Sequence, residues 1–328
     1  GTGSSTQGVL TSTSGFTINP ASGVTVSVSA NLAGSVGLTK SGAGTAELSG
    51  YNAYTGTTTL NSSGGVLAIT GSGSLSGTSS GVYSGAIVIG SGNTFKYSSS
   101  TNQTLQTGVI SGAGNLTKDT DASSVLTLTA ANTYTGLTTI SVGALAAANN
   151  TALGTAAGGV TVADGAALEL SGGITIGAEA LTLNGTGISS GGALRNISGD
   201  NTYAGVITLA SDSRINSDSG LLTLNVATGN AITGTFNITF GGANNISVAD
   251  PIDTSTGTLT KDGSGTLFLT GANNYTGATT ISAGIIRASH ASAFGTTAGG
   301  ITVASGAALQ LSGGITIGAE ALTLNNDG

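Results

Sequence analysis

A block of 27 residues occurs twice in this chain of 328 residues, and it constrains the fold more than any other feature. The first copy spans residues 158–184 and the second spans residues 299–325, an offset of 141 positions. Long internal matches of this kind are typical of arrays in which each unit buries its apolar face against the next. Three positions differ between the copies, and these are Val160/Ile301, Asp164/Ser305 and Glu169/Gln310.

Apolar residues alternate within the block, which is the period of a β-strand. The gaps between the alternating pairs hold Gly, Asp and Ser, which form tight turns. From Val160 to Leu181 there are 21 positions with three short strands and three corners. This pattern predicts one coil of a three-sided parallel β-solenoid. The alternating pairs expected to point inward are Val160/Val162, Leu168/Leu170, Ile174/Ile176 and Leu181/Leu183.

The three differences between the copies fit this interpretation. Val160/Ile301 would lie on the inner face, Glu169/Gln310 would face water, and Asp164/Ser305 would lie at a corner. Helices are disfavoured, because Gly and β-branched residues occur throughout the chain. The one exception is the alanine-rich stretch Val142–Gly154 with its counterpart after Ile286, for which we expect a short turn or corner excursion.

Composition excludes several classes of function. Charged residues make up 6% of the chain, the net charge is −7 and the seven Lys and Arg residues are scattered, so we expect no nucleic-acid partner. The chain has no Cys and one His, which leaves no thiolate site, histidine triad or His-rich metal site. No apolar stretch is long enough for a transmembrane segment. The start, Gly-Thr-Gly, suggests a mature fragment or a piece of a longer protein.

A second repeated element starts with Leu-Thr-Lys, at Leu38–Lys40, Leu116–Lys118 and Leu259–Lys261. In each copy an alternating strand follows, and then a corner with Asn, Tyr and Gly. The corner tyrosines are Tyr54, Tyr134, Tyr275 and, in a weaker copy, Tyr203. Their spacing predicts repeat units of roughly 38–115, 116–187, 188–258 and 259–328.

These corners carry a family resemblance. The segments Gly44–Leu60, Val125–Gly143 and Gly265–Ile281, with the lead-in Ile110–Lys118, resemble the passenger-associated repeat of bacterial autotransporters. The resemblance covers most of residues 38–328. It implies a right-handed parallel β-helix that is secreted across an outer membrane and is extracellular, either displayed at the bacterial surface or released. Two departures exist: no translocator barrel follows the last copy, and the Tyr203 copy lacks the Thr-Thr-Ile of the others. Type V secretion is therefore implied only for a longer parent protein.

The expected fold is thus all-β, a single right-handed parallel β-helix over residues 1–328, with about three short strands per coil of about 21 residues and about 15 coils. Parallel β-helices also host enzymes that act on polysaccharides, so the carboxylates need attention. Asp119/Asp121 and Asp250/Asp253 are close in sequence, but neither pair has an Arg or His one coil away. We interpret both pairs as structural, and His290 as solvated surface.

The recurring residues at the corners also have functional alternatives. Tyr54, Tyr134, Tyr203 and Tyr275 would make a sugar-stacking row if they were exposed. We instead predict buried rings whose hydroxyl groups bond to a neighbouring coil. The threonine pairs after the corners suggest an ice-binding plane, but at one pair per 70–80 residues they are too sparse for one. The sequence therefore predicts no catalytic, cofactor-binding or metal site and no cofactor.

The favoured function is structural and non-enzymatic: a surface-displayed shaft, adhesin or filament subunit. The alternative is a passenger that degrades polysaccharides or binds glycans. Expected partners are other copies of the chain, head to tail or side by side, and host or environmental glycans. The start Gly1–Leu10 resembles Gly185–Leu194, the segment directly after the first copy of the block, so it continues where the second copy stops. This match indicates either a piece of a longer tandem array or molecules that stack end to end.

Overall fold

The computed structural model describes residues 7–61, 64–79 and 81–325. The chain divides into two compact units, unit 1 up to Gly159 and unit 2 from Val160 onward, and each is described by itself. Residues 1–6 and 326–328, which enter the comparison of the two chain ends, lie outside the described residues. The four sequence units defined by the corner tyrosines stay a prediction.

Unit 1 is built from short strands. They are β1 (Val9–Thr11), β2 (Phe16–Ile18), β3 (Thr25–Val28), β4 (Asn31–Gly34), β5 (Leu38–Lys40), β6 (Thr45–Leu48), β7 (Ala53–Tyr54), β8 (Thr58–Leu60), β9 (Val66–Gly71), β10 (Gly81–Tyr83), β11 (Ile87–Ile89), β12 (Thr94–Ser99), β13 (Gln103–Leu105), β14 (Ile110–Ser111), β15 (Asn115–Lys118), β16 (Val125–Leu128), β17 (Thr138–Ile140) and β18 (Gly143–Ala147).

Unit 2 has the same character, with one 3-10 turn, η1 (Ile188–Ser190). Its strands are β19 (Val160–Val162), β20 (Ala166–Ser171), β21 (Thr175–Ile176), β22 (Leu181–Gly185), β23 (Leu194–Ser198), β24 (Asn201–Tyr203), β25 (Ile207–Ser217), β26 (Leu222–Leu224), β27 (Ile232–Gly234), β28 (Ile238–Gly241), β29 (Ile246–Val248), β30 (Ile252–Asp253), β31 (Leu259–Lys261), β32 (Thr266–Leu269), β33 (Thr279–Ile281), β34 (Ile285–Ala288), β35 (Ile301–Val303), β36 (Ala308–Leu311) and β37 (Leu322–Leu324).

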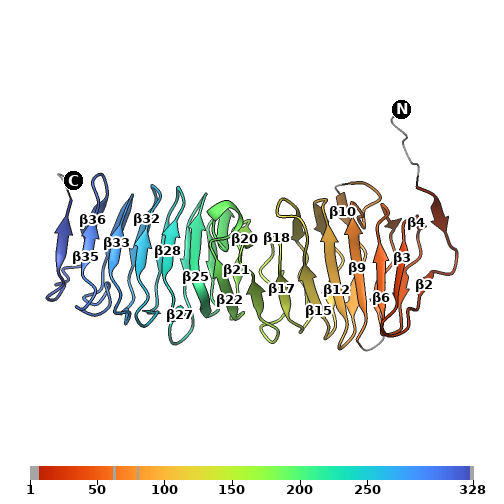
Figure 1. Cartoon of the computed structure of the whole chain (residues 1–328), viewed down its shortest axis with the longest axis horizontal. Coiled ribbons are helices and arrows are strands. Elements are labelled where there is room, and N and C mark those ends of the chain that lie inside the picture. Colours follow the sequence, from red (N-terminus) through yellow and green to blue (C-terminus); the bar gives the residue numbers. More distant parts are fainter. Residues whose placement is uncertain (1–6, 62–63, 80, 326–328) are drawn as a thin grey trace. The chain divides into compact units, whose positions relative to one another are not determined.

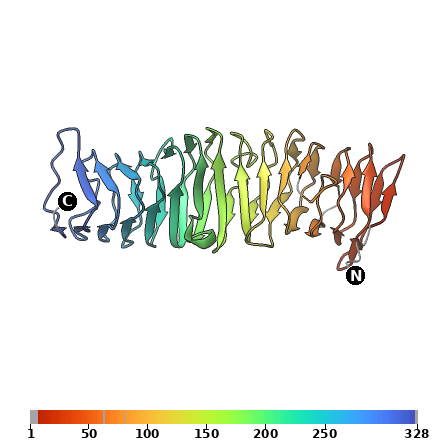
Figure 2. The same ribbon diagram turned by 90° about the horizontal axis from the view of Figure 1, so that it is seen from above.

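In each unit the strands of successive coils lie side by side and pair in parallel, as a right-handed β-solenoid (Figure 1). Val160 of β19 faces Leu181 of β22, which is the predicted step of 21 residues. Between these two strands the chain forms β20 and β21, so one coil holds three strands. The predicted three-sided coil is therefore confirmed. The turned view in Figure 2 shows the same side-by-side strands within each unit.

Three columns of strands define the sides of unit 2. Face A contains β19, β22, the first half of β25, β27 and β30. Face B contains β20, β23, the second half of β25, β28, β31, β33, β35 and β37. Face C contains β21, β24, β26, β29, β32, β34 and β36. Val160 therefore starts a strand of face A, whereas its sequence equivalent Ile301 starts a strand of face B. The two copies of the 27-residue block therefore begin on different sides of the unit.

Inward side chains form the core, as alternation predicted. In the first copy of the block all eight predicted inward residues are at most 5% exposed. These side chains stack on their equivalents in neighbouring coils. Full burial of a Val, Ile or Leu side chain stabilises the folded state by about 1.5–3 kcal/mol. Val160 and Ile301 are both buried, and Asp164 lies in a turn, so two of the three differing positions lie where we expected.

One local expectation is wrong for Glu169, although its equivalent Gln310 is exposed as expected, and a second holds only in part. Glu169 does not face water: it is 8% exposed, because Arg195 of the next coil covers it and forms an ion pair with it at 3.3 Å. Burial raises the pKa of the Glu169 carboxyl, and the charge of Arg195 opposes that shift. The alanine-rich stretch is not only a corner excursion, because residues 143–147 form β18 with every residue buried. The remainder of the stretch and of its counterpart forms turns as expected, at residues 150–153 and 291–294, and strand β34 extends only to Ala288.

Candidate functional site

The asparagines of the repeated corners link three successive coils. Asn132 accepts a hydrogen bond from Ile110 N (2.8 Å) in the preceding coil and donates one to Ala152 O (2.7 Å) in the following coil. Asn273 does the same with Ile252 N (2.8 Å) and Ala293 O (2.6 Å). Both side chains are buried, so each satisfies backbone groups that water cannot reach. We call these residues the bridging asparagines; Asn52 and Asn201 bind neighbouring backbone groups in a similar way.

The corner tyrosines are structural, as predicted. Tyr54, Tyr134, Tyr203 and Tyr275 are at most 1% exposed, which leaves no ring face for a sugar. Tyr203 makes the expected bond to a neighbouring coil, because its hydroxyl donates to Glu179 O (3.0 Å). In the other three copies the hydroxyl bonds to the threonine four residues later, at 2.6–2.8 Å. The Tyr203 copy lacks that threonine, which explains its different partner.

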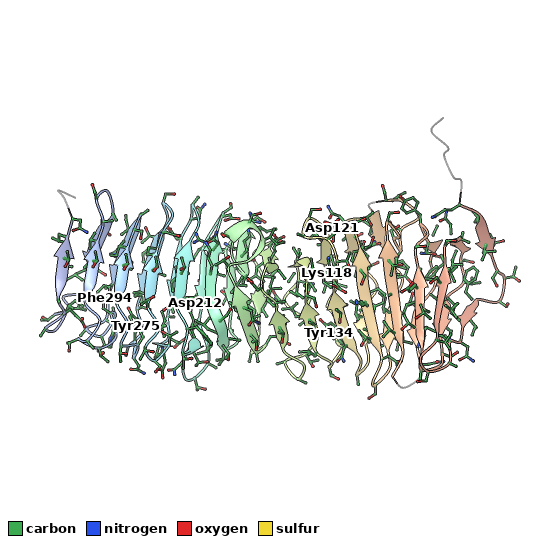
Figure 3. The ribbon with its side chains drawn as sticks, viewed as in Figure 1. Lys118, Asp121, Tyr134, Asp212, Tyr275 and Phe294 are labelled. Atoms are coloured by element: carbon green, nitrogen blue, oxygen red, sulfur yellow. The ribbon has the colours of Figure 1, made fainter. Side chains whose placement is uncertain are left out.

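Each Leu-Thr-Lys element ends in a buried lysine, which the sequence did not predict. Lys118 is fully buried, and its Nζ donates to Thr120 O (2.8 Å), Val142 O (3.1 Å) and Ser124 Oγ (2.8 Å). Lys261 donates to carbonyl oxygens of Asp262 (2.6 Å) and Gly263 (2.9 Å), and Lys40 to the carbonyl of Gly42. Burial lowers the pKa of Lys118 and of Lys261 to about 8. Figure 3 labels Lys118 and Tyr134 in unit 1, and Tyr275 in unit 2.

The carboxylate pairs considered for catalysis have structural partners. Asp119 forms an ion pair with Lys96 of the preceding coil at 2.5 Å. Burial pushes the pKa of Asp119 upward, but the bond to Lys96 and its charge outweigh this and hold the pKa below its ordinary value. Asp121 accepts hydrogen bonds from Ser123 N (2.9 Å) and Ser123 Oγ (2.6 Å) in the same turn.

The second pair and the single histidine also have local roles. Asp250 accepts a bond from Val226 N (2.7 Å), and Asp253 one from Asn230 Nδ2 (3.2 Å). His290 is half-buried rather than fully solvated, because its Nδ1 accepts a bond from Ser292 N (3.0 Å) and holds a turn. Among the described residues no cluster of three or more His, Cys, Asp or Glu could hold a metal ion.

An open groove of about 850 Å³ lies in unit 2, at the corner where four successive coils leave face A. We call it the A–B groove. Asp164 comes from the first of these corners, Ser211 and Asp212 from the third, and Phe236 from the fourth. The second corner is the longest, residues 186–193 with η1, and it lies between the first and third corners, where Gly185 N donates to Ser211 Oγ (2.8 Å). The full lining is Thr161, Ala163, Asp164, Asn184, Gly185, Thr186, Ser211, Asp212 and Phe236.

Asn237 fixes the carboxylate of Asp212 and the turn that carries Phe236. Asp212 accepts two bonds from Asn237, at 2.9 Å from the backbone N and 2.8 Å from Nδ2. On its other side Asn237 Oδ1 accepts from Thr258 N (2.9 Å) of the following coil. Phe236 directly precedes Asn237, so its turn is fixed to the coils on both sides. Figure 3 labels Asp212 on unit 2.

Outward threonines form continuous columns, which corrects the expectation that they are sparse. On face A, Thr161, Thr182, Thr208 and Thr233 pair in register on successive coils. On face B the column is Thr239, Thr260, Thr280, Thr302 and Thr323. The expectation considered only the threonine pairs after the tyrosine corners, whereas the columns also use single threonines inside other strands.

Comparison with known proteins agrees with this architecture. A family model, the passenger-associated-transport-repeat, matches residues 38–69, 123–147 and 259–288. A curated relative, the adhesin BmaC autotransporter of Brucella suis biovar 1 (strain 1330), is 40% identical over 95 residues. These matches support an autotransporter passenger with passenger-associated repeats. The matched region is 26% of this chain and 3% of the relative, so the chain spans only a small part of that protein's length. No solved structure matches the passenger significantly.

The matched segments coincide with the structural residues described above. Each matched segment contains a buried corner asparagine and a buried corner tyrosine, and the first and third segments also contain a buried lysine. A passenger of this kind is displayed at the bacterial surface, which is the localisation that the resemblance implied. Within the described part of the chain, no helix has the length and apolarity that crossing a membrane requires.

Proposed function

We propose that this passenger is a non-enzymatic, adhesive element of the cell surface. The observation that carries the proposal is the use of its repeated polar residues. The bridging asparagines, the corner tyrosines and the buried lysines all bond to the backbone or side chains of their own or adjacent coils. Side chains that bond coil to coil keep the solenoid rigid and do not contact a partner. Contact with a partner is therefore made by the outward side chains. The name of the relative, an adhesin, supports the same role.

A display experiment tests the proposal. The chain would be fused to the translocator of an unrelated autotransporter and displayed on a non-adherent laboratory strain. We expect more bacteria to bind to epithelial cell layers than with the same translocator carrying a non-adhesive β-solenoid of equal length. Equal binding of the two strains, at equal surface density of the passengers, would contradict an adhesive role. Release of oligosaccharides from polysaccharides by the purified passenger would favour the enzymatic alternative instead.

A second candidate, end-to-end assembly, is favoured by one comparison within unit 2. Leu181 and Leu183 are at most 1% exposed beneath the following coil. Their sequence equivalents Leu322 and Leu324, in the last described strand, are 51% and 64% exposed. A following coil covers the first pair, and a further coil, supplied by the same polypeptide or by another copy, would cover the second pair in the same way. Strand edges with exposed apolar residues pair readily with further strands.

We propose that copies of this chain stack through these edges. Multi-angle light scattering at increasing concentration is expected to show growing particles, and Leu322→Lys with Leu324→Lys to suppress the growth. Val206→Lys, at another exposed apolar position, is the matched control. Monomers at all concentrations would refute this assembly and would leave the adhesive role untouched.

A further inference from the structure

We propose that the A–B groove binds a neutral glycan, with the sugar chain lying across the corners of successive coils. This inference rests on the adhesive function proposed above and names a ligand class for it. The groove combines an exposed aromatic ring, two fixed or exposed carboxylates and small hydroxyl side chains on one surface. Such a mixture of one apolar platform with several hydrogen-bonding groups is what a ligand with both C–H and O–H faces requires.

Phe236 supplies the apolar platform. It is 38% exposed and is the one aromatic among the exposed large hydrophobic side chains of the described residues. Single exposed apolar residues are common on soluble proteins and need no function. Phe236 differs because it lines a hollow and because the bonds of Asn237 to two other coils fix its turn. Because the turn is fixed, the ring can accept the apolar face of a pyranose without the entropy cost of ordering the backbone that carries it.

Asp212 supplies acceptors for sugar hydroxyl groups. An ionised carboxylate has about four acceptor positions, and the two bonds from Asn237 use one on each oxygen. The remaining positions are exposed, and the carboxylate cannot turn away without breaking both bonds. Asp164, two coils earlier, is also exposed and lines the same groove. Charged acceptors bind hydroxyl donors more strongly than neutral ones do.

The charge of the groove selects among glycans. Two carboxylates and no Lys or Arg line it, and the chain as a whole carries −7. Uronate, sialylated or sulfated chains would meet like charges without a compensating cation, so they are disfavoured. Neutral hexose chains carry only hydroxyl donors and acceptors, and they fit this lining.

The duplicated block supplies an internal comparison. Its two copies differ at only three positions, and one of them is Asp164, which is Ser305 in the second copy. The corner with Ser305 lies next to face B, whereas the corner with Asp164 lies next to face A. The second copy therefore lacks both this carboxylate and the neighbouring corners with Asp212 and Phe236. Glycan binding is assigned to the first copy only.

Binding of the purified full chain to immobilised cello-, malto- and manno-oligosaccharides tests the proposal, with oligogalacturonate as the anionic probe. We expect saturable binding to at least one neutral series and none to oligogalacturonate. Phe236→Ala and Asp164→Ser should each weaken the neutral binding about tenfold, the loss of one good contact. The serine variant carries the residue that the second copy has naturally, so it is expected to fold. Leu137→Ala, at a residue of similar exposure (40%) outside the groove, is the control and should bind like the parent chain.

Three results would overturn the inference: no binding to any neutral series, equal binding of the Phe236→Ala and parent chains, or stronger binding to oligogalacturonate. Circular dichroism of each variant shows whether a loss of binding reflects unfolding. The two proposals fail separately. If bacteria that display the parent chain adhere while the purified chain binds no neutral glycan, the adhesive function is retained and the glycan site is refuted.

Discussion

Substitution of a bridging asparagine tests the central claim that buried polar residues hold successive coils together. Asn132→Ala removes the acceptor of Ile110 N and the donor to Ala152 O, and both backbone groups are left buried. An orphaned buried group costs about 1–3 kcal/mol, so the two together cost about 2–6 kcal/mol. Asn115→Ala is the matched control, because Asn115 also accepts one bond between coils, from Leu137 N, but at an exposed site. Water can replace that bond, and we expect a loss below about 1 kcal/mol.

Urea unfolding followed by circular dichroism measures the two free energies. Because repeat arrays can unfold in parts, hydrogen exchange of the peptide that contains Ile110 should be measured as well. The amide of Ile110 is expected to exchange much faster in Asn132→Ala than in the parent chain, and to exchange at the parent rate in Asn115→Ala. If both variants lost the same stability, the argument from buried coil-to-coil bonds would be refuted.

Other buried groups give three more predictions. The free energy of unfolding should rise from about pH 8 towards pH 10, because Lys118 and Lys261 bind protons less tightly when folded (pKa about 8) than when unfolded (10.5); a urea midpoint that falls over this interval would contradict it. Gly284→Ala should lower the free energy of unfolding, measured by urea titration, clearly more than Gly306→Ala does, although both glycines have positive φ. A Cβ at residue 284 would lie 2.4 Å from a carbonyl oxygen of the preceding coil, whereas a Cβ at residue 306 would have nothing within 4 Å. Equal losses of stability would refute the close-packing argument. Tyr134→Phe should lower thermal stability by about 1 kcal/mol through loss of one buried hydrogen bond; an unchanged melting temperature would count against that bond.

The sequence was sufficient for the fold because alternation and turn residues act within single strands. Val160 and Val162 alternate in β19 and both are buried, as are the later pairs of the coil. The same rule fails at corners. Phe236 has the parity of Ile238 and Phe240, both buried, yet it precedes the strand and is exposed in a turn. Alternation therefore does not reveal which apolar residues form a surface platform.

The A–B groove could not be predicted because it depends on how coils of unequal length align. The step from Leu181 to its partner Ile207 is 26 residues, whereas the step from Val160 to Leu181 is 21. Such differences decide which corners become neighbours, and no local pattern records them. The substitution Asp164/Ser305 was the one visible signal, because it placed a charge difference at a corner of otherwise nearly identical copies.

The change of side between the two copies of the block affects how unit 2 meets its surroundings. Because one copy begins on face A and the other on face B, their outward residues point in different directions. A flat target touching the unit from one direction therefore meets different residues of the two copies rather than the same residues twice. Duplication therefore presents each set of outward residues in two directions around the axis of unit 2, and it does not present two equal sets towards any single surface.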